Sequence, residues 1–402
     1  MISVFSEIKP LKKVLVHTPG EEINNLTPTQ LGELLFDDIP WLPLAVKEHQ
    51  AFVEAFQKEG VEVLYLVDLV EQSLKNKKII DEFIEEYIQE ADIKSQTLCE
   101  VVNKYLHTLN TRDLIYKCIN GIKKEELPNY KKRTLSDFVS QSLFIANPMP
   151  NLYFTRDPFA SIGNGVAINQ MYSKTRNRET LFAKYIFKYH DLYKDTVHYY
   201  DRDEKYNIEG GDILVLNEKT LVIGISQRTS TEGATRLAKN LLFREDNQYE
   251  TVLAFSIPSD RSFMHLDTVL TQVDYTKFIM HGGALKNLEI YKMTKNPKKY
   301  DKLIVKKLNK PLKEVFEEYL GSEVTLIPCG GSDQIDSARE QWSDGSNCVC
   351  VRPGVVICYE RNEISNQVLE KNGIKVIRIP SSELSRGRGG PRCMSMPLER
   401  EL

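Results

Sequence analysis

No apolar run in this chain of 402 residues is long enough to span a lipid bilayer. The opening residues, Met1–Pro10, also lack the basic stretch followed by an apolar stretch that marks a secretory leader. Neither sign of charge dominates, because 53 Lys and Arg stand against 56 Asp and Glu, leaving a net charge of −3. We therefore expect neither a nucleic-acid partner nor a membrane partner.

Cysteine is scarce, and its seven copies are an odd number without the regular spacing of a disulfide framework. Cys348 and Cys350 would share one face of a strand near Cys358, which makes a zinc site conceivable. A structural zinc site usually needs a second Cys-x-x-Cys or His pair, and this spacing lacks one. We expect no metal, no cofactor and the reduced thiols of a cytoplasmic protein.

Strand, turn and helix signals recur as a unit made of a β-hairpin, a helix and a further strand. One copy is expected as strands 159–162 and 166–168, helix 178–190 and strand 196–200. A last copy forms only if the chain ends pair, with 393–396 beside 13–17, then helix 44–58 and strand 61–66. The other copies have hairpins at 213–225, 268–280 and 348–359, helices at 232–243, 312–320 and 363–372, and closing strands at 251–256, 323–327 and 374–379.

Five such units that share the two chain ends predict a closed ring, because closure removes exposed sheet edges. We predict an α/β fold, a five-bladed pseudo-symmetric α/β propeller closed by both termini. The stretch 70–147 has helical periodicity and few strand signals, and it predicts an all-helical insertion domain. The catalytic propeller would then comprise residues 1–69 and 148–402.

Polar clusters precede the first hairpin strand of four units: 155–158, 209–212, 265–267 and 388–393. In a pseudo-symmetric ring these positions converge on the axis, so a thiol, an imidazole and several carboxylates would share one cavity. These groups suit a guanidinium, whose N–H groups carboxylates accept in pairs. A thiolate could attack its central carbon, and a histidine could transfer the protons.

Each of these residues is weaker evidence for a catalytic site when it is considered alone. A single histidine is more often a satisfied core or surface residue, but Asp267 lies two residues after His265, on the same face of an extended chain. Asp157 before proline is a common turn arrangement. Cys393 follows a polar, glycine-rich loop with three arginines, which argues against an inert core thiol.

Five segments in order resemble the arginine deiminase family: Ser6–Gly20, Asn151–Phe159, Ile208–Asp212, Met264–Thr268 and Arg388–Met394. The resemblance covers essentially the whole chain, and the C-terminal ending is most similar to the mycoplasma-type members. It implies a five-bladed α/β propeller that hydrolyses free L-arginine to L-citrulline and ammonia. It also implies a homodimer.

The resemblance further implies a role for each site residue. Cys393 would be the nucleophile that forms an amidino-thioether, and His265 the general acid and base, supported by Glu209. Asp157 and Asp267 would hold the guanidinium. Substrate binding would fall to Asn151, Arg176 and Arg228 at the carboxylate, Phe154 along the side-chain slot and Arg388 on a mobile loop, with Arg178 a second candidate for the position of Arg176.

Three other functions remain open. The chain could act on another guanidino compound or transfer the amidino group, although two carboxylate-binding arginines favour an α-amino acid. It could be a non-catalytic scaffold, although the thiol and the histidine are both retained. It could be a cysteine peptidase, but no peptidase motif surrounds Cys393, and nearby carboxylates raise a thiol pKa. We therefore expect the cationic substrate itself to favour the thiolate.

Overall fold

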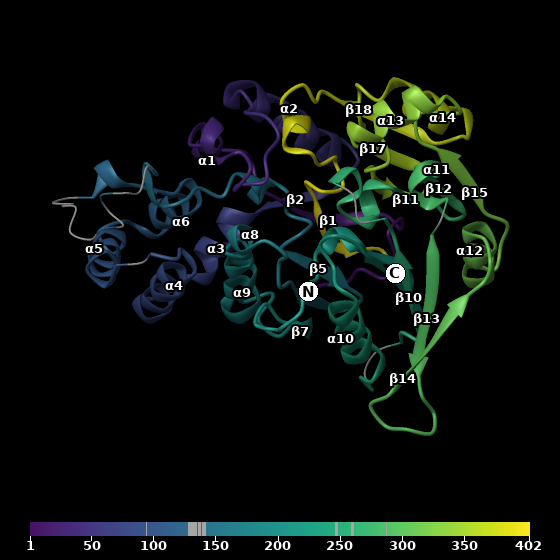
Figure 1. The fold of residues 1–402 in the computed structure, drawn as a ribbon, viewed down its shortest axis with the longest axis horizontal. Coiled ribbons are helices and arrows are strands. Elements are labelled where there is room, and N and C mark those ends of the chain that lie inside the picture. The colour runs from purple at the N-terminus through teal and green to yellow at the C-terminus, as the bar shows by residue number, and fades with distance from the viewer. Residues whose placement is uncertain are drawn as a thin grey trace.

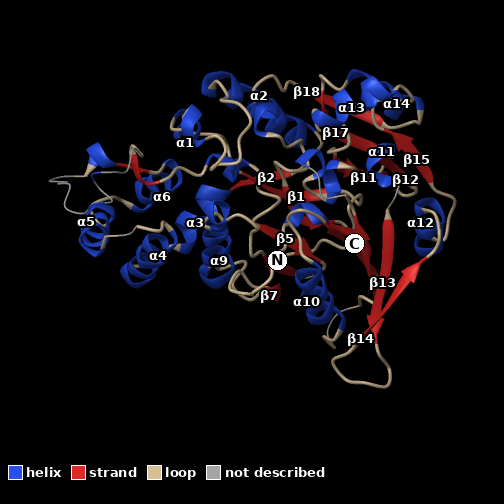
Figure 2. Cartoon of the chain, viewed as in Figure 1, coloured by secondary structure: helices blue, strands red, loops and turns tan. Residues whose placement is uncertain are grey.

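The computed structural model describes residues 1–93, 95–127, 135, 138, 142–245, 248–258, 261–286 and 288–402. The fold is mixed α/β, with strands inside and helices mostly on the outside (Figures 1 and 2). Within these residues, no helix combines the length and the apolar character that a membrane crossing requires.

The predicted hairpin–helix–strand unit is confirmed in five copies. In each copy an antiparallel hairpin is extended by a third strand that runs parallel to the second. The sheets are β5 (Phe159–Ile162), β6 (Gly165–Ile168) and β7 (Val197–Tyr200); β8 (Ile213–Asn217), β9 (Thr220–Ile225) and β10 (Thr251–Ser256); β11 (Leu270–Asp274), β12 (Lys277–Met280) and β15 (Thr325–Pro328); β16 (Val349–Arg352), β17 (Val355–Tyr359) and β18 (Lys375–Ile379); and β19 (Met396–Arg400), β1 (Leu11–Val16) and β2 (Glu62–Tyr65).

A helix joins the second and third strands of each unit, which we call a module. The spacing of apolar residues places one face of each helix against the strands, as α10 shows by burying Leu237 and Leu241. Its N-cap Ser230 accepts the Gly233 N–H at 3.0 Å. The module helices are α9 (Thr180–Tyr189), α10 (Thr231–Leu242), α12 (Leu312–Leu320), α14 (Glu363–Lys371) and α2 (Leu42–Lys58), and shorter ones are α1 (Glu21–Asn24), α8 (Lys174–Asn177), α11 (Gly282–Leu285) and α13 (Gln334–Trp342).

The two chain ends pair as expected, with β1 antiparallel to β19 and Leu15 opposite Met396. The predicted strand start at Cys393 is wrong, because β19 begins at Met396. The Met394 N–H donates to the Gly390 carbonyl and the Ser395 N–H to the Arg392 carbonyl, so the chain turns here instead of joining the ladder. The nucleophile candidate therefore lies in a turn just before its strand.

Neighbouring modules contact one another. Strand β5 contacts β19, β11 contacts β16, and β16 contacts β1. The Gly210 N–H donates to the Asp157 carbonyl at 3.1 Å, which joins the first two modules. The 3₁₀ turns at Gly210–Asp212 and Leu266–Thr268 contact each other, which joins the second and third. The loops that precede the first strands are thereby brought together.

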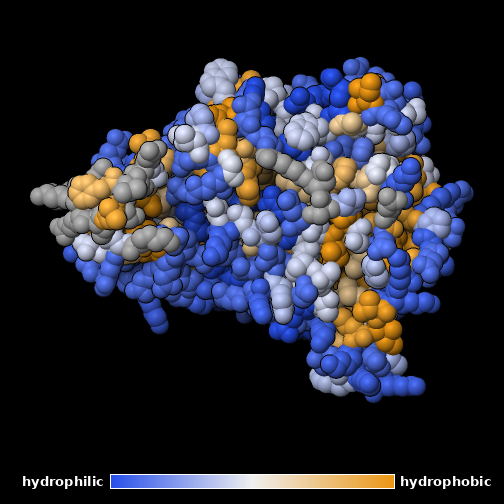
Figure 3. Space-filling view, in the orientation of Figure 1, coloured by the Kyte–Doolittle hydropathy of each residue, from blue (hydrophilic) through white to orange (hydrophobic). Residues whose placement is uncertain are grey.

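One hairpin was not predicted. Strands β13 (Glu289–Lys295) and β14 (Leu303–Leu308) add to β10 and extend the second sheet to five strands in the order β14-β13-β10-β9-β8. Their lysines mask the strand signal, as is common where an exposed edge must resist pairing. Ile304 and Val305 of β14 are exposed, and apolar residues gather over this projecting hairpin in Figure 3.

The segment 70–147 is largely helical, but it is not all-helical as predicted. After α3 (Leu66–Ser73), α4 (Lys77–Glu90), α5 (Gln96–Leu106) and α6 (Thr111–Asn120), β3 (Ile122–Lys123) pairs with β4 (Phe144–Ala146). Gly121, with φ of 80°, ends α6 and turns the chain into β3. Residues 94, 128–134, 136, 137 and 139–141 of the predicted insertion lie outside the described residues.

The helices of this segment pack on α9. The Phe83 ring meets Tyr185 edge-on at a centroid distance of 5.1 Å, and Lys184 pairs with Glu86 at 2.8 Å. Buried residues of α4, α5 and α6 belong to the same hydrophobic cluster as those of β5, β6 and α9. The helical segment is therefore anchored to the first module by a shared core.

Helix α2 forms hydrogen bonds with the loop that follows β18. The Glu48 carboxylate accepts the backbone N–H groups of Glu383 and Leu384, both at 2.9 Å. The next residue, His49, is completely buried, and neither ring nitrogen forms a hydrogen bond within the described chain. Burial, together with the charge of His17, lowers the pKa of His49 to about 3.

We predict that His49 makes the fold sensitive to acid. The folded pKa of His49, about 3, lies below the unfolded value of about 6.5. Below about pH 6.5 the unfolded state therefore binds more protons than the folded state, and the free energy of unfolding decreases as the pH is lowered. The unfolding free energy of His49→Leu relative to the wild type should therefore rise by about 2 kcal/mol between about pH 7 and about pH 4.5. Urea unfolding at both pH values measures this, and an unchanged difference would refute it.

Candidate active site

The loops before the first strands enclose a cavity of about 20 Å³. All the predicted site residues except Glu209 and Asp267 line it, and these two lie directly behind, in contact with His265 and Cys393. The lining consists of Leu35, Asn151, Phe154, Asp157, Arg176, Arg228, Met264, His265, Thr268, Gly387, Arg388 and Cys393. The structure thus brings the residues named from sequence into one place.

The loops fit together only because glycines allow close approach. A Cβ at Gly211 would lie 2.7 Å from the His265 ring. Asp212 accepts the Leu266 N–H at 2.8 Å and the Ser226 hydroxyl at 2.6 Å, and so fixes the turn that carries His265. Gly211 and Asp212 of the motif at 209–212 therefore serve the placement of the imidazole.

His265 is buried between two carboxylates. Its Nε2 lies 2.7 Å from Glu209 Oε2, and its Nδ1 lies 3.8 Å from Asp157 Oδ1. Burial alone would lower the pKa of His265, but the charge of Asp157 and the hydrogen bond with Glu209 outweigh it and raise the pKa to about 9. The hydrogen bond with His265 and the charge of Arg228 lower the pKa of Glu209 to about 2 against the effect of burial. At neutral pH the pair is an imidazolium and a carboxylate.

Cys393 carries the thiol of the cavity. Its Sγ lies 3.8 Å from Asp267 Oδ2. Burial, and then the negative charges of Asp267, Asp157 and Asp344, raise the pKa of Cys393 well above its usual range. Without a cationic partner, this thiol stays protonated near neutral pH.

Asp267 and Asp157 each have one carboxylate oxygen that accepts a hydrogen bond and one that accepts none from the described residues, although the second oxygen of Asp157 lies 3.8 Å from His265 Nδ1. Asp267 Oδ2 accepts Arg392 Nη1 at 2.7 Å, and Asp157 Oδ2 accepts Arg176 Nη1 at 2.8 Å. The Oδ1 atoms of both aspartates are buried and accept no hydrogen bond from the described residues. Since buried acceptors are normally satisfied, these oxygens could accept N–H groups from a planar cation held in the cavity.

The structure separates the two arginine candidates. Arg176 lines the cavity and binds Asp157 and Glu179, whereas Arg178 turns away and donates to the Asn147 carbonyl at 3.0 Å. Arg228 lies over the Tyr172 ring, 5.6 Å from its centroid. The expected pair of carboxylate-binding arginines, 176 and 228, therefore shares the cavity.

Arg388 closes the cavity. Its backbone is left-handed, with φ of 61°, and its guanidinium lies 3.5 Å from the centre of the Trp342 ring. Asp37 pairs with it at 3.4 Å. Neighbouring Gly389 packs on Phe154, where a Cβ would lie 2.3 Å from the ring. About 20 Å³ holds roughly one water molecule, so an amino-acid substrate requires this roof to move.

Three further residues support the site and were not singled out from sequence. Arg392 joins Asp267 to the buried Glu7, which its Nη2 meets at 3.2 Å. Asn347 accepts the Cys393 N–H at 3.0 Å. Asn347 lies just before β16, the place that polar clusters occupy in the other modules, so its position in the repeat could have revealed it.

Among the described residues, Asp157, Glu209 and His265 also have the spacing of a metal site, with ligand atoms within 4.8 Å of one another. A metal here would have to displace the proton that Asp157 and Glu209 favour on His265. The acceptor oxygens left without hydrogen bonds on Asp157 and Asp267 fit an organic cation with several N–H groups. The cysteines weighed for zinc diverge: Cys348 and Cys358 lie 2.9 Å apart, while Cys350 Sγ faces the Arg352 carbonyl.

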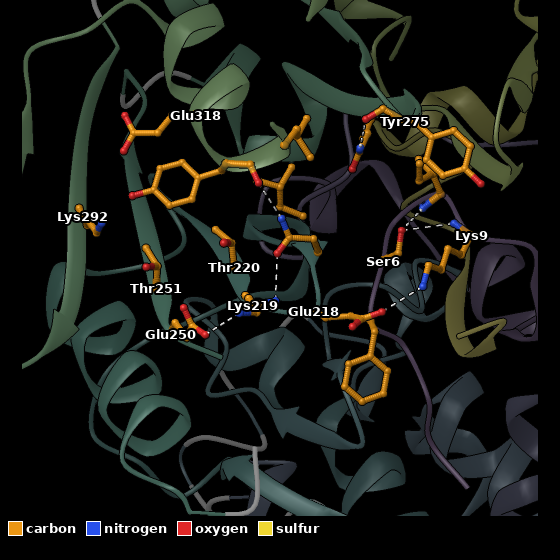
Figure 4. A pocket seen from close by; sticks show the side chains of 17 residues that line it. Ser6, Lys9, Glu218, Lys219, Thr220, Glu250, Thr251, Tyr275, Lys292 and Glu318 are labelled. Atoms are coloured by element: carbon orange, nitrogen blue, oxygen red, sulfur yellow. Dashed lines mark hydrogen bonds and ion pairs between the residues drawn. The ribbon is translucent and has the colours of Figure 1, made fainter. Parts of the chain in front are cut away.

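A larger cavity of about 530 Å³ lies at the β8–β9 turn (Figure 4). Four of its charged side chains form two ion pairs, Lys9 with Glu218 at 3.1 Å and Lys219 with Glu250 at 2.8 Å. No cysteine or histidine lines it among the described residues. Its described lining therefore offers no thiol or imidazole for chemistry.

Comparison with known proteins agrees with this geometry. The arginine deiminase family pattern matches residues 32–400. An arginine deiminase from Clostridium perfringens is 50% identical over 405 residues, covering 100% of this chain and 98% of the relative. One from Treponema denticola is 49% identical over 406 residues, covering 100% and 99%.

Solved structures share the fold at low identity. SxtG, an amidinotransferase from Microseira wollei, has a TM-score of 0.56 at 14% identity and covers 100% of this chain and 98% of its own. The N-terminal domain of ArgZ, a cyanobacterial arginine dihydrolase bound to product, has a TM-score of 0.54 at 14% identity, covering 96% and 97%. With half of its residues identical to a relative over the full length, the chain belongs to the arginine deiminase family.

Proposed function

We propose that the chain hydrolyses free L-arginine to L-citrulline and ammonia through a covalent intermediate on Cys393. The observation that carries this proposal is the pair of buried aspartate oxygens without hydrogen-bond partners beside a protonated thiol and an imidazolium. A guanidinium supplies the N–H donors that Asp157 and Asp267 lack. Its positive charge also offsets the carboxylates that keep the thiol protonated.

In the first half-reaction, Cys393 loses its proton to solvent when the guanidinium binds, and the thiolate attacks the central carbon. The C–S bond forms and the guanidinium becomes a neutral tetrahedral adduct. The His265 imidazolium protonates one amino group, the C–N bond breaks, and ammonia leaves. The product is a cationic amidino-thioether on Cys393, with His265 neutral and hydrogen-bonded to Glu209.

In the second half-reaction, neutral His265 takes a proton from water, and the hydroxide attacks the same carbon. The new tetrahedral adduct collapses as its hydroxyl proton leaves to solvent and the C–S bond breaks. L-Citrulline and the Cys393 thiolate result. Of the two protons released to solvent, ammonia takes up one, and the thiolate takes up the other once L-citrulline has left. Glu209 stabilises the imidazolium that each cycle regenerates.

The amino-acid end of arginine would lie against Asn151, Arg176 and Arg228, with Phe154 along its aliphatic part and Arg388 in the roof. Two arginines suit an α-carboxylate, which agmatine lacks. In the closed state Arg176 is paired with Asp157 and Glu179, so substrate binding would change this pairing.

We further propose that the five modules close into a propeller, a reading that the contacts of β19 with β5, β11 with β16 and β16 with β1 support. Residues 1–69 and 148–402 would form this unit, and residues 70–147 an insertion domain packed on α9. A cytoplasmic homodimer is the proposed state. The free cysteines fit a reducing compartment.

Cys393→Ser should lower citrulline formation by at least about 10³-fold, because a hydroxyl in this acidic pocket is a far weaker nucleophile. Cys99→Ser, a thiol of α5 outside the site, is the matched control and should keep wild-type turnover. Citrulline and ammonia are measured with arginine, agmatine and methylarginine. Residual turnover near the wild-type level in Cys393→Ser, or turnover of another compound with none of arginine, would contradict the proposal.

Glu209→Gln should lower the pKa of His265, because it removes the carboxylate that stabilises the imidazolium. The imidazolium is the acid of the first half-reaction, and kcat reports ionisations of the bound enzyme, so its alkaline limb should move to lower pH. In the free wild type, ¹³C-histidine NMR should find His265 titrating at about 9. A limb that stays in place in Glu209→Gln would count against the role of His265.

A further inference from the structure

In the fourth module, Asn347 lies where the other four modules carry their candidate catalytic residues, just before the first strand. It lies two residues before β16, as Asp157 lies two residues before β5. The corresponding turns of the second, third and fifth modules carry Glu209, Asp267 and Cys393. Asn347 is completely buried, although it does not line the cavity.

The side chain of Asn347 connects two of these turns. Its Oδ1 accepts the backbone N–H of Cys393 at 3.0 Å, and its Nδ2 donates to the backbone carbonyl of Asp267 at 3.1 Å. One planar amide therefore links the backbone of Cys393 to the backbone of Asp267, whose carboxylate Oδ2 lies 3.8 Å from the Cys393 sulfur.

The backbone of Asn347 also supports the nucleophile turn. Its carbonyl accepts the Arg392 N–H at 3.3 Å. A Cβ at Gly390 would lie 2.7 Å from that carbonyl oxygen and 2.8 Å from the Asn347 side chain, so the turn packs against Asn347 at a distance that glycine alone permits.

We propose that Asn347 is a positioning residue that sets the distance between the Cys393 thiol and the Asp267 carboxylate. The inference rests on the proposed function, because it assigns Asn347 to the attack on the guanidinium carbon. That attack needs the reacting atoms about 3–3.5 Å apart, and a displacement of about 1 Å can lower a rate by about 10²-fold. Arg392 still holds the Asp267 carboxylate when the Asn347 amide is removed, so binding of arginine is largely unaffected.

The test compares Asn347→Ala with Asn362→Ala. Asn362 is a matched control because it is equally buried and its Nδ2 donates to a loop carbonyl, that of Ser343, at 2.9 Å, without touching Cys393 or Asp267. Single turnovers with arginine are quenched in acid, and the adduct on Cys393 is quantified by mass spectrometry. We expect adduct formation about 10- to 100-fold slower in Asn347→Ala, with KM within about threefold and wild-type-like rates in Asn362→Ala.

Asn347→Asp provides a second variant of the same size. It keeps the acceptor for the Cys393 N–H, loses the donor to Asp267 and adds a charge that raises the thiol pKa, so its deficit should narrow as pH rises. If Asn347→Ala does not fold, the rate of adduct formation in Asn347→Asp tests the proposed role of Asn347 instead.

Adduct formation within about threefold of wild type in the folded variant, or an equal loss in Asn362→Ala, overturns the role of Asn347. A wild type that forms no citrulline overturns the proposed function instead.

Discussion

The site depends on the pairing of buried carboxylates with buried cations. Asp157, Glu209 and Asp267 are taken out of water around one thiol, and such charges are tolerated only when they are matched. Arg176 and His265 offset the first two, and Arg392, fixed by Glu7, offsets the third. The matching leaves one oxygen of Asp157 and one of Asp267 without a donor, and the thiol protonated. On the proposed function, a planar monocation would supply donors to both oxygens and offset the negative charge that keeps the thiol protonated, so that substrate binding would also activate the nucleophile.

This pairing explains why the repeat matters for function. Asp157, Glu209, Asp267 and Cys393 come from the turns before the first strands of four different modules, and His265 lies in the same turn as Asp267. The separation of Cys393 and His265 is therefore set by how the modules pack rather than by any local loop. The glycines at 211 and 390 and the carboxylate of Asp212 hold these turns at contact distance. The Arg388 loop then covers the assembled charges and leaves room for about one water molecule, which strengthens the electrostatic interactions inside.

Local patterns were sufficient to predict much of this. The predicted ranges 251–256 and 312–320 coincide with β10 and α12, and the predicted hairpin 348–359 contains β16 and β17, because each has a clear apolar period and a turn signal beside it. The β13–β14 hairpin was missed, since lysines on an exposed edge obscure alternation, and the turn at Cys393 was misread, since hydrogen bonds from its own loop replace the ladder. Asn347 and Arg392 support the site through contacts with residues far away in the sequence. The residues next to them in the sequence do not reveal those contacts. The resemblance of motifs supplied roles for Arg176 and Arg228 that spacing alone left open.

The most direct test is the pKa of the Cys393 thiol with and without a bound cationic analogue of arginine that reacts slowly. Rates of alkylation across pH, followed at Cys393 by mass spectrometry, give both values. The electrostatic account predicts a pKa above the usual thiol range in the free enzyme and a clearly lower one in the complex. A thiol that is already ionised at neutral pH in the free enzyme, or one whose pKa does not respond to the analogue, would contradict it.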